Sequence, residues 1–359
     1  MFEPKFTITS DIIKSLMSIE ANKEIISSLP ITPKILLSLK ETSKYLSTHY
    51  STAIEGNTLT KKEVQEVIEK NNTPRERNEK EVMGYYSALE YVYEIAEKKA
   101  VITENIIKNI HGIVMSNGKN KRIKPTEYRD GQNVIKEAGS GLIVYMPPEA
   151  KDVTPLMQEM IQWIETEKNN IPIPVIAGII HYQFATIHPY WDGNGRTARL
   201  LTTLVLHLNG YDMKGIYSLE EYYAKDLKNY YSHLSIGNHN YYMGRAEEDI
   251  THWIQYFCKG MEISFGSVRK NIEEHNKKGD IKDKNTEILK LDIKQRKVLY
   301  LFINKDEISS SDIALTLGVS VRTANNLCIK WQEEDFIKAN NQKRKGRKYS
   351  LTKKWLDIL

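Results

Sequence analysis

Cysteine is scarce in this chain: its 359 residues include only Cys258 and Cys328, which lie far apart. Two distant thiols give neither a disulfide framework nor a metal-binding one, and they fit the reducing cytoplasm. The sequence also lacks an apolar run long enough to cross a bilayer, and its first residues lack the charged and apolar regions of a signal peptide. We therefore expect a cytoplasmic protein that makes no membrane contact.

A net positive charge is also absent from most of the chain. The net charge of +5 comes from the C-terminal end, where residues 281–359 hold 17 basic and 10 acidic side chains, so that the first 280 residues carry −2. Because nucleic-acid binding depends on positive charge, any such hypothesis is confined to this end. The rest is ordinary: 40% hydrophobic and 27% charged residues supply a soluble core, over a length that suggests two or three domains.

The stretch richest in reactive side chains runs from His188 to Arg199 and reads His-Pro-Tyr-Trp-Asp-Gly-Asn-Gly-Arg-Thr-Ala-Arg. Apolar runs at 173–187 and 200–208 flank it, which predicts a short loop between two buried helices, with the second helix starting inside the stretch. A glycine-containing helix start leaves backbone N–H groups free to bind an anion, phosphate above all. Arg196 lies one turn before Arg199, so both arginines can face that anion.

This stretch resembles the signature of the Fic family, His-Pro-Phe-x-Asp/Glu-Gly-Asn-Gly-Arg-x-x-Arg, and fits eleven of its twelve positions. Tyr190 is the departure, a mild one if its ring only anchors the loop. Fic proteins mostly transfer AMP from ATP to a Ser, Thr or Tyr hydroxyl of a protein. The alternative interpretation is a glycine-rich helix cap that carries surface arginines.

The resemblance implies a role for each polar position of the stretch. His188 would be the general base that deprotonates the target hydroxyl, and Asp192 would hold Mg²⁺ between the α- and β-phosphates of ATP. Arg199 would bind the γ-phosphate. The remaining phosphate-binding positions are Gly193, Asn194, Gly195, Arg196 and Thr197.

A helix predicted over about 33–54 ends in the sequence Ser-Thr-Ala-Ile-Glu-Gly at 51–56. This is similar to the inhibitory motif of Fic proteins, Ser/Thr-x-x-x-Glu-Gly/Asn. A carboxylate at a helix C-terminus meets the unfavourable end of the helix dipole, so a partner cation is welcome there. The resemblance implies a brake in which Glu55 pairs with Arg199 in place of the γ-phosphate. The motif residues are Ser51, Glu55 and Gly56, and the alternative is a solvated glutamate at a helix end.

Residues 128–135 and 142–146 predict two short strands, and a lone hairpin is marginal in water. Fic proteins carry such a hairpin as a flap that pairs with the target segment by strand addition. The resemblance therefore implies that this flap contacts the target. The alternative is a surface hairpin without a function. The flap residues expected to contact the target are Ile143, Val144, Tyr145 and Met146.

A tyrosine-rich segment follows the motif. Aromatic residues at helical spacing are usually core residues, yet Fic proteins place a Tyr-Tyr pair near the adenine, with an Asn several residues later. The resemblance therefore implies that Tyr230, Tyr231 and Asn238 belong to the nucleotide pocket. His111 and His181, by contrast, lie on apolar helices, and we expect them in the core.

We expect a mainly α-helical chain with a Fic helical core, a β-hairpin flap and a C-terminal winged helix-turn-helix. The predicted regions are an N-terminal helical region at 1–100, the Fic core at 101–276, a charged linker at 277–292 and the winged helix at 293–359. The last region shows a helix, then a helix-Gly-helix pattern and a basic turn, and its partner would be DNA or a protein. Its phosphate contacts would come from Lys343, Arg344, Lys345, Arg347 and Lys348.

The sequence therefore predicts an adenylyltransferase that uses ATP, modifies protein hydroxyls including its own, and is inhibited by Glu55. The alternatives are AMP removal or transfer of another nucleotide at the same site, and a DNA-binding regulator without enzymatic activity. Phosphorylation, as in the Doc class, is disfavoured because that class has Lys where Gly195 stands here. Relatives often pair, which leaves a homodimer open.

Overall fold

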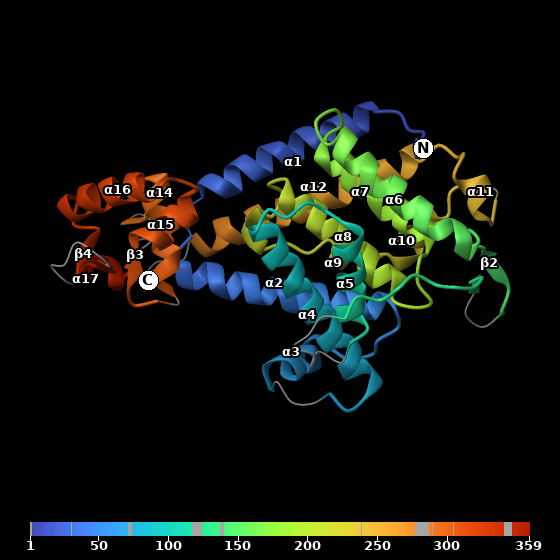
Figure 1. Ribbon diagram of the computed structural model, residues 1–359, viewed down its shortest axis with the longest axis horizontal. Helices are drawn as coiled ribbons and strands as arrows, with labels where there is room; N and C mark the ends of the chain where they lie inside the picture. The colour runs from blue at the N-terminus through green and yellow to red at the C-terminus, as the bar shows by residue number, and fades with distance from the viewer. Residues whose placement is uncertain are drawn as a thin grey trace. The chain divides into compact units, whose positions relative to one another are not determined.

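The computed structural model describes residues 2–29, 31–70, 74–116, 124–136, 140–237, 239–276, 287–288, 290–303, 305–340 and 347–359. It is mainly helical with small strands, as the sequence predicted (Figure 1). The chain divides into two compact units: residues 1–27 with 41–268 form the first, and residues 28–40 with 269–359 form the second. The domain boundaries drawn from the sequence stay predictions, and the linker at 277–292 lies mostly outside the described residues.

The N-terminal helices begin where the sequence provides capping side chains. Thr60 and Glu63 bond to each other's backbone N–H groups at the start of α3 and form a capping box. The Thr103 hydroxyl accepts a hydrogen bond from the N–H of Ile106 and so caps α5. These helices are α1 (Ser10–Ser28), α2 (Pro33–Ile54), α3 (Lys61–Lys70), α4 (Arg77–Glu97) and α5 (Glu104–Val114).

Two adjacent helices, α7 (Ile173–Ile187) and α8 (Asn194–Leu208), form the centre of the first unit. Nearly every residue of α7 is buried, as its apolar sequence predicted, and α7 packs along α8. Helix α8 also packs against α4 and α5, so the short loop between α7 and α8 rests on a close-packed core. The flanking elements are β1 (Ile135–Lys136), β2 (Ile143–Tyr145) and α6 (Ala150–Glu167).

After α8 the chain returns to this centre through a long helix. The indole N–H of Trp253, a fully buried residue, donates a hydrogen bond to the Gly178 carbonyl of α7 at 2.7 Å. Gly178 allows this close approach, because a Cβ there would lie 3.0 Å from the Phe257 ring. The elements of this segment are η1 (Met213–Gly215), α9 (Glu220–Lys225), α10 (Leu227–Leu234), α11 (Tyr242–Arg245) and α12 (Thr251–Asn276).

The flap hairpin is present but shorter than the sequence predicted. Strands β1 and β2 pair antiparallel with a register irregularity, whereas we had expected strands over 128–135 and 142–146. The first part of that segment is held as a loop instead. The N–H of Arg129 donates to the Pro189 carbonyl at 2.9 Å, and the Asn133 side chain donates to the Tyr190 carbonyl. The Arg129 contact uses a backbone N–H that a longer strand would need.

The second unit has its own apolar core, which includes the fully buried Trp331 and Phe336. Its three strands form an antiparallel sheet in the order β3-β5-β4. Gly318, at φ +65°, ends α15 in a left-handed turn, as predicted. The elements are α14 (Ile293–Leu299), η2 (Tyr300–Ile303), β3 (Ile308–Ser309), α15 (Ser310–Leu317), α16 (Val321–Glu333), β4 (Ile337–Ala339), β5 (Lys348–Leu351) and α17 (Lys353–Leu356).

The predicted helix and helix-Gly-helix pattern of this region are present as α14, α15 and α16, whereas β3 and α17 were not predicted. Its assignment as a winged helix-turn-helix, and DNA or a protein as its partner, stay predictions. Of the basic side chains expected to contact phosphates, Lys343, Arg344 and Lys345 lie outside the described residues. In the described part of the chain, no helix has the length and apolarity needed to cross a membrane.

The close packing of α4 on α5 predicts the effect of adding a methyl group at Gly84. A Cβ there would lie 2.3 Å from the Val114 carbonyl oxygen and 2.7 Å from that of Ser116, so the backbones must separate. We expect Gly84→Ala to lower the free energy of unfolding by about 1–3 kcal/mol, measured by urea denaturation.

The matched control is Gly266→Ala in α12, where the nearest side-chain atom would lie 4.0 Å away. Because alanine favours helix, this variant should be as stable as the parent or gain up to about 1 kcal/mol. Equal midpoints for the parent and Gly84→Ala would contradict the packing described for α4 and α5.

Candidate active site

The loop between α7 and α8 is closed by its own residues. Helix α7 ends at His188 in the left-handed conformation, and Gly193, at φ +75°, leads into α8. The Asn194 side chain accepts a hydrogen bond from the Tyr190 N–H at 2.9 Å and donates one to the Tyr190 carbonyl at 2.8 Å. The loop is thus fixed before any ligand arrives, and the first N–H groups of α8 remain available to an anion.

The buried rings of His111 and Tyr190 support this loop. The two rings stack with centroids 3.5 Å apart, and both residues are buried. His111 Nε2 also lies 2.9 Å from the Asp192 carbonyl oxygen. Burial lowers the pKa of His111 to about 4, so the ring is neutral at pH 7. The core position expected for His111 is confirmed, and Tyr190 acts as the anchor that its place in the motif suggested.

Arg129 is a buried residue of this site that the sequence did not reveal. Its guanidinium donates to the carbonyls of His188 at 3.0 Å and Gly131 at 2.8 Å, and also to that of Pro148. Burial lowers the pKa of this arginine. The three bonds tie the His188 backbone to the segments on both sides of the flap. No local pattern distinguished Arg129 from a surface arginine in a predicted strand.

His188 is partly buried at the end of α7. Burial lowers the pKa of its imidazole to about 4, and the Glu55 carboxylate only partly offsets that effect. The ring is therefore neutral at pH 7 and able to accept a proton. This is the protonation state that a general base needs.

Asp192 and Arg196 face a cavity of about 310 Å³. The Asp192 side chain is 63% exposed, and its carboxylate lies 3.5 Å from the buried Arg196 guanidinium. Arg196 Nε is buried without a hydrogen-bond partner among the described residues, which suits a site for an anion. The cavity is also lined by Arg77, Lys80, Glu81, Val114, Met115 and Ser116.

The cation expected at Asp192 is compatible with this geometry. Among the described residues, no three His, Cys, Asp or Glu side chains gather to hold a metal ion. Mg²⁺ does not require such a cage, because it keeps several waters and is commonly bound by one or two carboxylates together with substrate phosphates. A single exposed carboxylate beside an arginine-lined cavity fits that mode.

Arg199 is the most heavily bonded residue of the site. Its guanidinium donates through Nε to the Ser51 hydroxyl at 2.7 Å, and through Nη2 to the Ser51 carbonyl at 2.9 Å and to Glu55 Oε1 at 2.8 Å. The arginine side chain is 1% exposed and that of Glu55 is 29% exposed. Burial disfavours the charge of Arg199, but the Glu55 carboxylate leaves the guanidinium pKa above its ordinary value. The pairing expected between these residues is therefore present.

The Glu55 carboxylate also lies against the start of α8. A Cβ at Gly195 would stand 2.2 Å from Glu55 Oε1, so only glycine leaves room for this contact. A carboxylate at a helix N-terminus, paired with an arginine of the same helix, occupies the position that suits a phosphate. Glu55 therefore takes the place of an anion in this structure. Gly56, at φ +90°, provides the turn that ends α2 directly after it.

The residues expected in the nucleotide pocket lie in different environments. Tyr231 is 45% exposed and donates a hydrogen bond to the Ile54 carbonyl at 3.4 Å, so its ring is accessible to a base. Tyr230 is 2% exposed, and its hydroxyl lies 2.9 Å from His181 Nε2. Tyr230 thus supports the site from inside the core, where His181 was also expected. Asn238 lies outside the described residues, and Thr197 is fully buried.

The flap residues also differ in exposure. Ile143, Val144 and Met146 are exposed, with 48%, 42% and 44% of their surfaces accessible. Tyr145 points into the protein, where its hydroxyl donates to the Thr186 carbonyl at 2.8 Å. Tyr145 therefore holds the flap to α7, and the Met146 backbone bonds Asn240 and Tyr242, whereas the side chains of Ile143 and Val144 are exposed.

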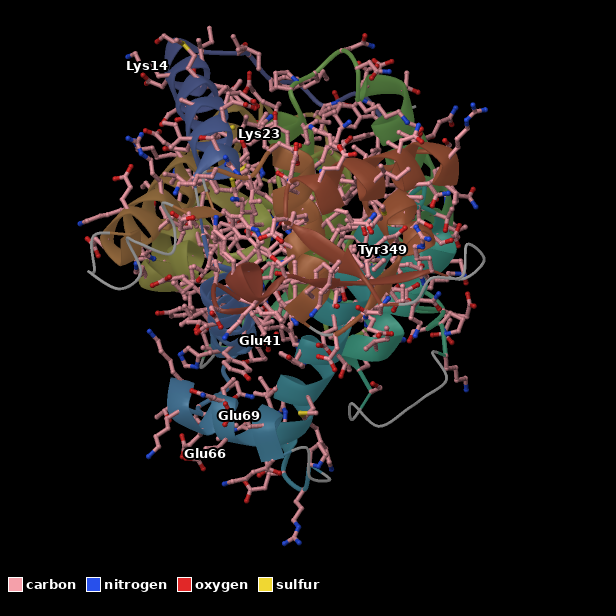
Figure 2. The ribbon with its side chains drawn as sticks, turned by 90° about the vertical axis from the view of Figure 1, so that its left-hand side faces the viewer. Lys14, Lys23, Glu41, Glu66, Glu69 and Tyr349 are labelled. Carbon is pink, nitrogen blue, oxygen red and sulfur yellow. The ribbon has the colours of Figure 1, made fainter. Side chains whose placement is uncertain are left out.

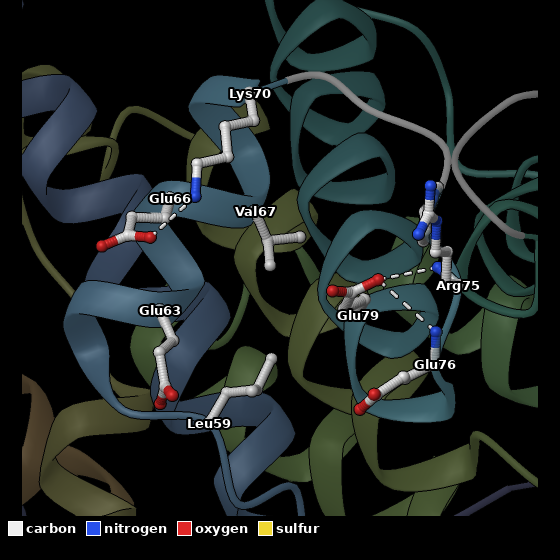
Figure 3. A pocket seen from close by; sticks show the side chains of 9 residues that line it. Leu59, Glu63, Glu66, Val67, Lys70, Arg75, Glu76 and Glu79 are labelled. Carbon is white, nitrogen blue, oxygen red and sulfur yellow. Dashed lines mark hydrogen bonds and ion pairs between the residues drawn. The ribbon is translucent and has the colours of Figure 1, made fainter.

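A second cavity, of about 710 Å³, lies between α3 and α4 (Figure 3). Its carboxylates are already engaged. Glu66 pairs with Lys70, and Glu79 accepts from the N–H groups of Arg75 and Glu76 (Figure 3). Glu66 and Glu69 both lie on α3 of the first unit (Figure 2). This cavity brings together no base and phosphate-binding residues, so the loop after α7 is the candidate active site.

The comparisons with known proteins agree with this site. Residues 101–206 match the model of the Fic/DOC family, and the 188–199 loop lies inside this match. The protein adenylyltransferase Fic of Drosophila mojavensis is 29% identical over 212 residues, which cover 56% of this chain and 40% of that protein. The Drosophila melanogaster protein of the same name is 28% identical over 212 residues, covering 56% and 41%. The chain spans about two fifths of the length of these relatives.

Solved structures show the same fold. A Fic family protein from Desulfovibrio desulfuricans aligns with a TM-score of 0.60 at 24% identity, over 98% of this chain and 99% of its own. Fic-1 from C. elegans aligns with a TM-score of 0.59 at 22% identity, over 73% of each chain. These likenesses show the fold and do not by themselves show the activity.

The buried histidines predict how stability depends on pH. Burial lowers the pKa of His181 to about 3, and that of His111 and His188 to about 4, from the ordinary 6.5. As the pH falls below about 6.5, these histidines take up protons in the unfolded chain but stay neutral in the folded protein. The free energy of unfolding therefore falls as the pH decreases from 6.5 toward 4. We expect a lower urea midpoint at pH 5 than at pH 7, and a smaller difference in His181→Gln. A pH-independent midpoint would rule this out.

Proposed function

We propose that this protein transfers AMP from ATP to the hydroxyl of a protein side chain, its own included. The observation that supports this most is the arrangement of the 188–199 loop. A neutral His188, the free N–H groups of α8 and two buried arginines converge there, within the segment that matches the Fic/DOC family. Phosphoryl-type transfer depends mainly on positioning and charge stabilisation, and these groups provide both.

In the proposed reaction, His188 accepts the proton of the target hydroxyl. The hydroxyl oxygen then bonds to the α-phosphorus of ATP, the bond from that phosphorus to the bridging oxygen breaks, and pyrophosphate leaves. The N–H groups at Asn194 and Gly195 and the guanidinium of Arg196 stabilise the charge that develops on the phosphate oxygens. The Gly193 N–H, which donates to the Asp192 carboxylate at 2.6 Å in this structure, would join them once Asp192 turns to a cation. Asp192 would hold Mg²⁺, which neutralises charge between the α- and β-phosphates when bound.

The exposed side of the flap presents the target. Ile143, Val144 and Met146 lie at the surface, whereas Tyr145 anchors the strand to α7. An extended target segment would add to this short strand through backbone hydrogen bonds. Such binding places little demand on the target sequence, which is compatible with modification of the protein itself.

Glu55 would act as an intramolecular inhibitor of this reaction. Its carboxylate holds Arg199 at 2.8 Å and lies against Gly195, where the γ-phosphate would otherwise reach the arginine. ATP would then bind with its phosphates displaced from the position for attack. A charge-assisted bond to a buried guanidinium is stronger than a surface ion pair, so the effect on ATP is substantial.

Removing the Glu55 side chain should therefore activate the protein. We expect Glu55→Gly to increase self-labelling by ATP and Mg²⁺ about tenfold or more, which corresponds to about 1.4 kcal/mol in the competition for Arg199. Adding His188→Ala to that variant should abolish labelling, because no base remains. Mass spectrometry of the intact chain and of a cell lysate measures both the adduct mass and the targets.

Glu55→Gln and Glu69→Gln form a matched pair for this experiment. Both remove one negative charge, but Glu69 lies on the exposed part of α3, away from the loop. Only Glu55→Gln should raise labelling. If the parent and Glu55→Gly label equally, the inhibitory role is wrong, and if no nucleotide labels any variant, the transferase activity is wrong.

A further inference from the structure

A second carboxylate of the first unit is buried, and the mechanism above does not use it. Glu220, the first residue of α9, is 3% exposed. Its Oε1 accepts a hydrogen bond from the Tyr85 hydroxyl at 3.0 Å, and its Oε2 accepts one from the Ser218 hydroxyl at 2.9 Å. Both partners are neutral, yet burying a carboxylate is costly unless a positive charge compensates it.

Tyr85 connects this carboxylate to the inhibitory motif. The tyrosine comes from α4 and is fully buried, and the nearby Ser51 hydroxyl acts to lower its pKa. Burial raises the pKa of Tyr85 well above its ordinary value, and the charge of Glu220 raises it further, while Arg199 acts in the opposite direction. The phenol therefore stays protonated between a carboxylate and a guanidinium.

Two hydrogen bonds flank the Tyr85 phenol. Arg199 Nε donates to the Ser51 hydroxyl oxygen at 2.7 Å, and the Tyr85 hydroxyl donates to Glu220 at 3.0 Å. The pKa of Tyr85 responds to Ser51, Arg199 and Glu220, so the phenol lies close enough to both charges to couple them electrostatically.

We propose that Glu220 is a fixed counter-ion of Arg199, acting through Tyr85 and Ser51, and that it is a positioning residue for ATP. Glu55 is the exchangeable counter-ion, because its side chain is 29% exposed and sits at the end of a helix. Glu220 is buried and stays in place. When Glu55 withdraws, Glu220 keeps the buried guanidinium compensated and oriented until a γ-phosphate arrives. This inference rests on the proposed function for its ATP step.

The two carboxylates should therefore substitute for each other in stabilising the ligand-free protein. We expect Glu55→Gly and Glu220→Gln each to lower the melting temperature modestly. The double variant should lose about 3–6 °C more than the two single losses together, because Arg199 then lacks both counter-ions. ATP should restore this excess loss, whereas ADP, which has no γ-phosphate, should not.

Matched controls separate this role from a general loss of packing. Glu221→Gln makes the same charge change at the next residue, whose carboxylate contacts Tyr50 and Lys225, and it should combine additively with Glu55→Gly. Tyr85→Phe removes the hydrogen bond to Glu220 but keeps that residue, and it should show the excess loss with Glu55→Gly. If Glu220→Gln fails to fold, Tyr85→Phe replaces it in the test.

Each outcome of these measurements either supports or contradicts the counter-ion role of Glu220. The proposed role of Glu220 as a counter-ion would be wrong if the losses of melting temperature for Glu55→Gly add to those of both Glu220→Gln and Tyr85→Phe. It would also be wrong if ATP and ADP restored the melting temperature equally. An excess loss that ATP selectively restores supports it. An excess loss in the ligand-free protein, with no response to ATP in any variant and no labelling of Glu55→Gly, supports the counter-ion and overturns the proposed function instead.

Discussion

The rest of the site depends on one buried charge, the guanidinium of Arg199. A charge in this position must be compensated, and the end of α2 does so directly through Ser51 and Glu55. In the proposal above, Glu220 at the start of α9 adds to this through Tyr85 of α4. The requirement that stabilises the core would then also define the proposed phosphate site and the group proposed to block it.

The loop before Arg199 illustrates a different principle, rigidity obtained from short-range bonds. Asn194 closes the loop on Tyr190, His111 supports the Tyr190 ring, and Arg129 holds the His188 carbonyl. None of these side chains needs to touch a substrate to matter. They hold the base and the helix start in a fixed relation, which is the condition for efficient transfer between bound reactants.

The sequence predicted the features that lie within one continuous stretch but missed most contacts between distant segments. The 188–199 stretch is contiguous, so its loop, its helix start and its buried flanking helices followed from pattern alone. The pairing of Glu55 with Arg199 spans 144 residues and came only through the resemblance to a family. Arg129, Tyr85 and Glu220 went unrecognised because a buried polar residue has no periodic signature. The flap strands were overestimated because their backbone groups bond to the loop instead.

Under the proposed inhibition, the position of Glu55 on the same chain as Arg199 has a further consequence. An inhibitor tethered to its own site acts at a constant effective concentration, whatever the amount of protein in the cell. Dilution cannot release it, and rising ATP alone must compete against that constant term. The level of inhibition is therefore set by how firmly the last turn of α2 is held. Any partner that displaces this turn would act as an activator without touching the catalytic loop.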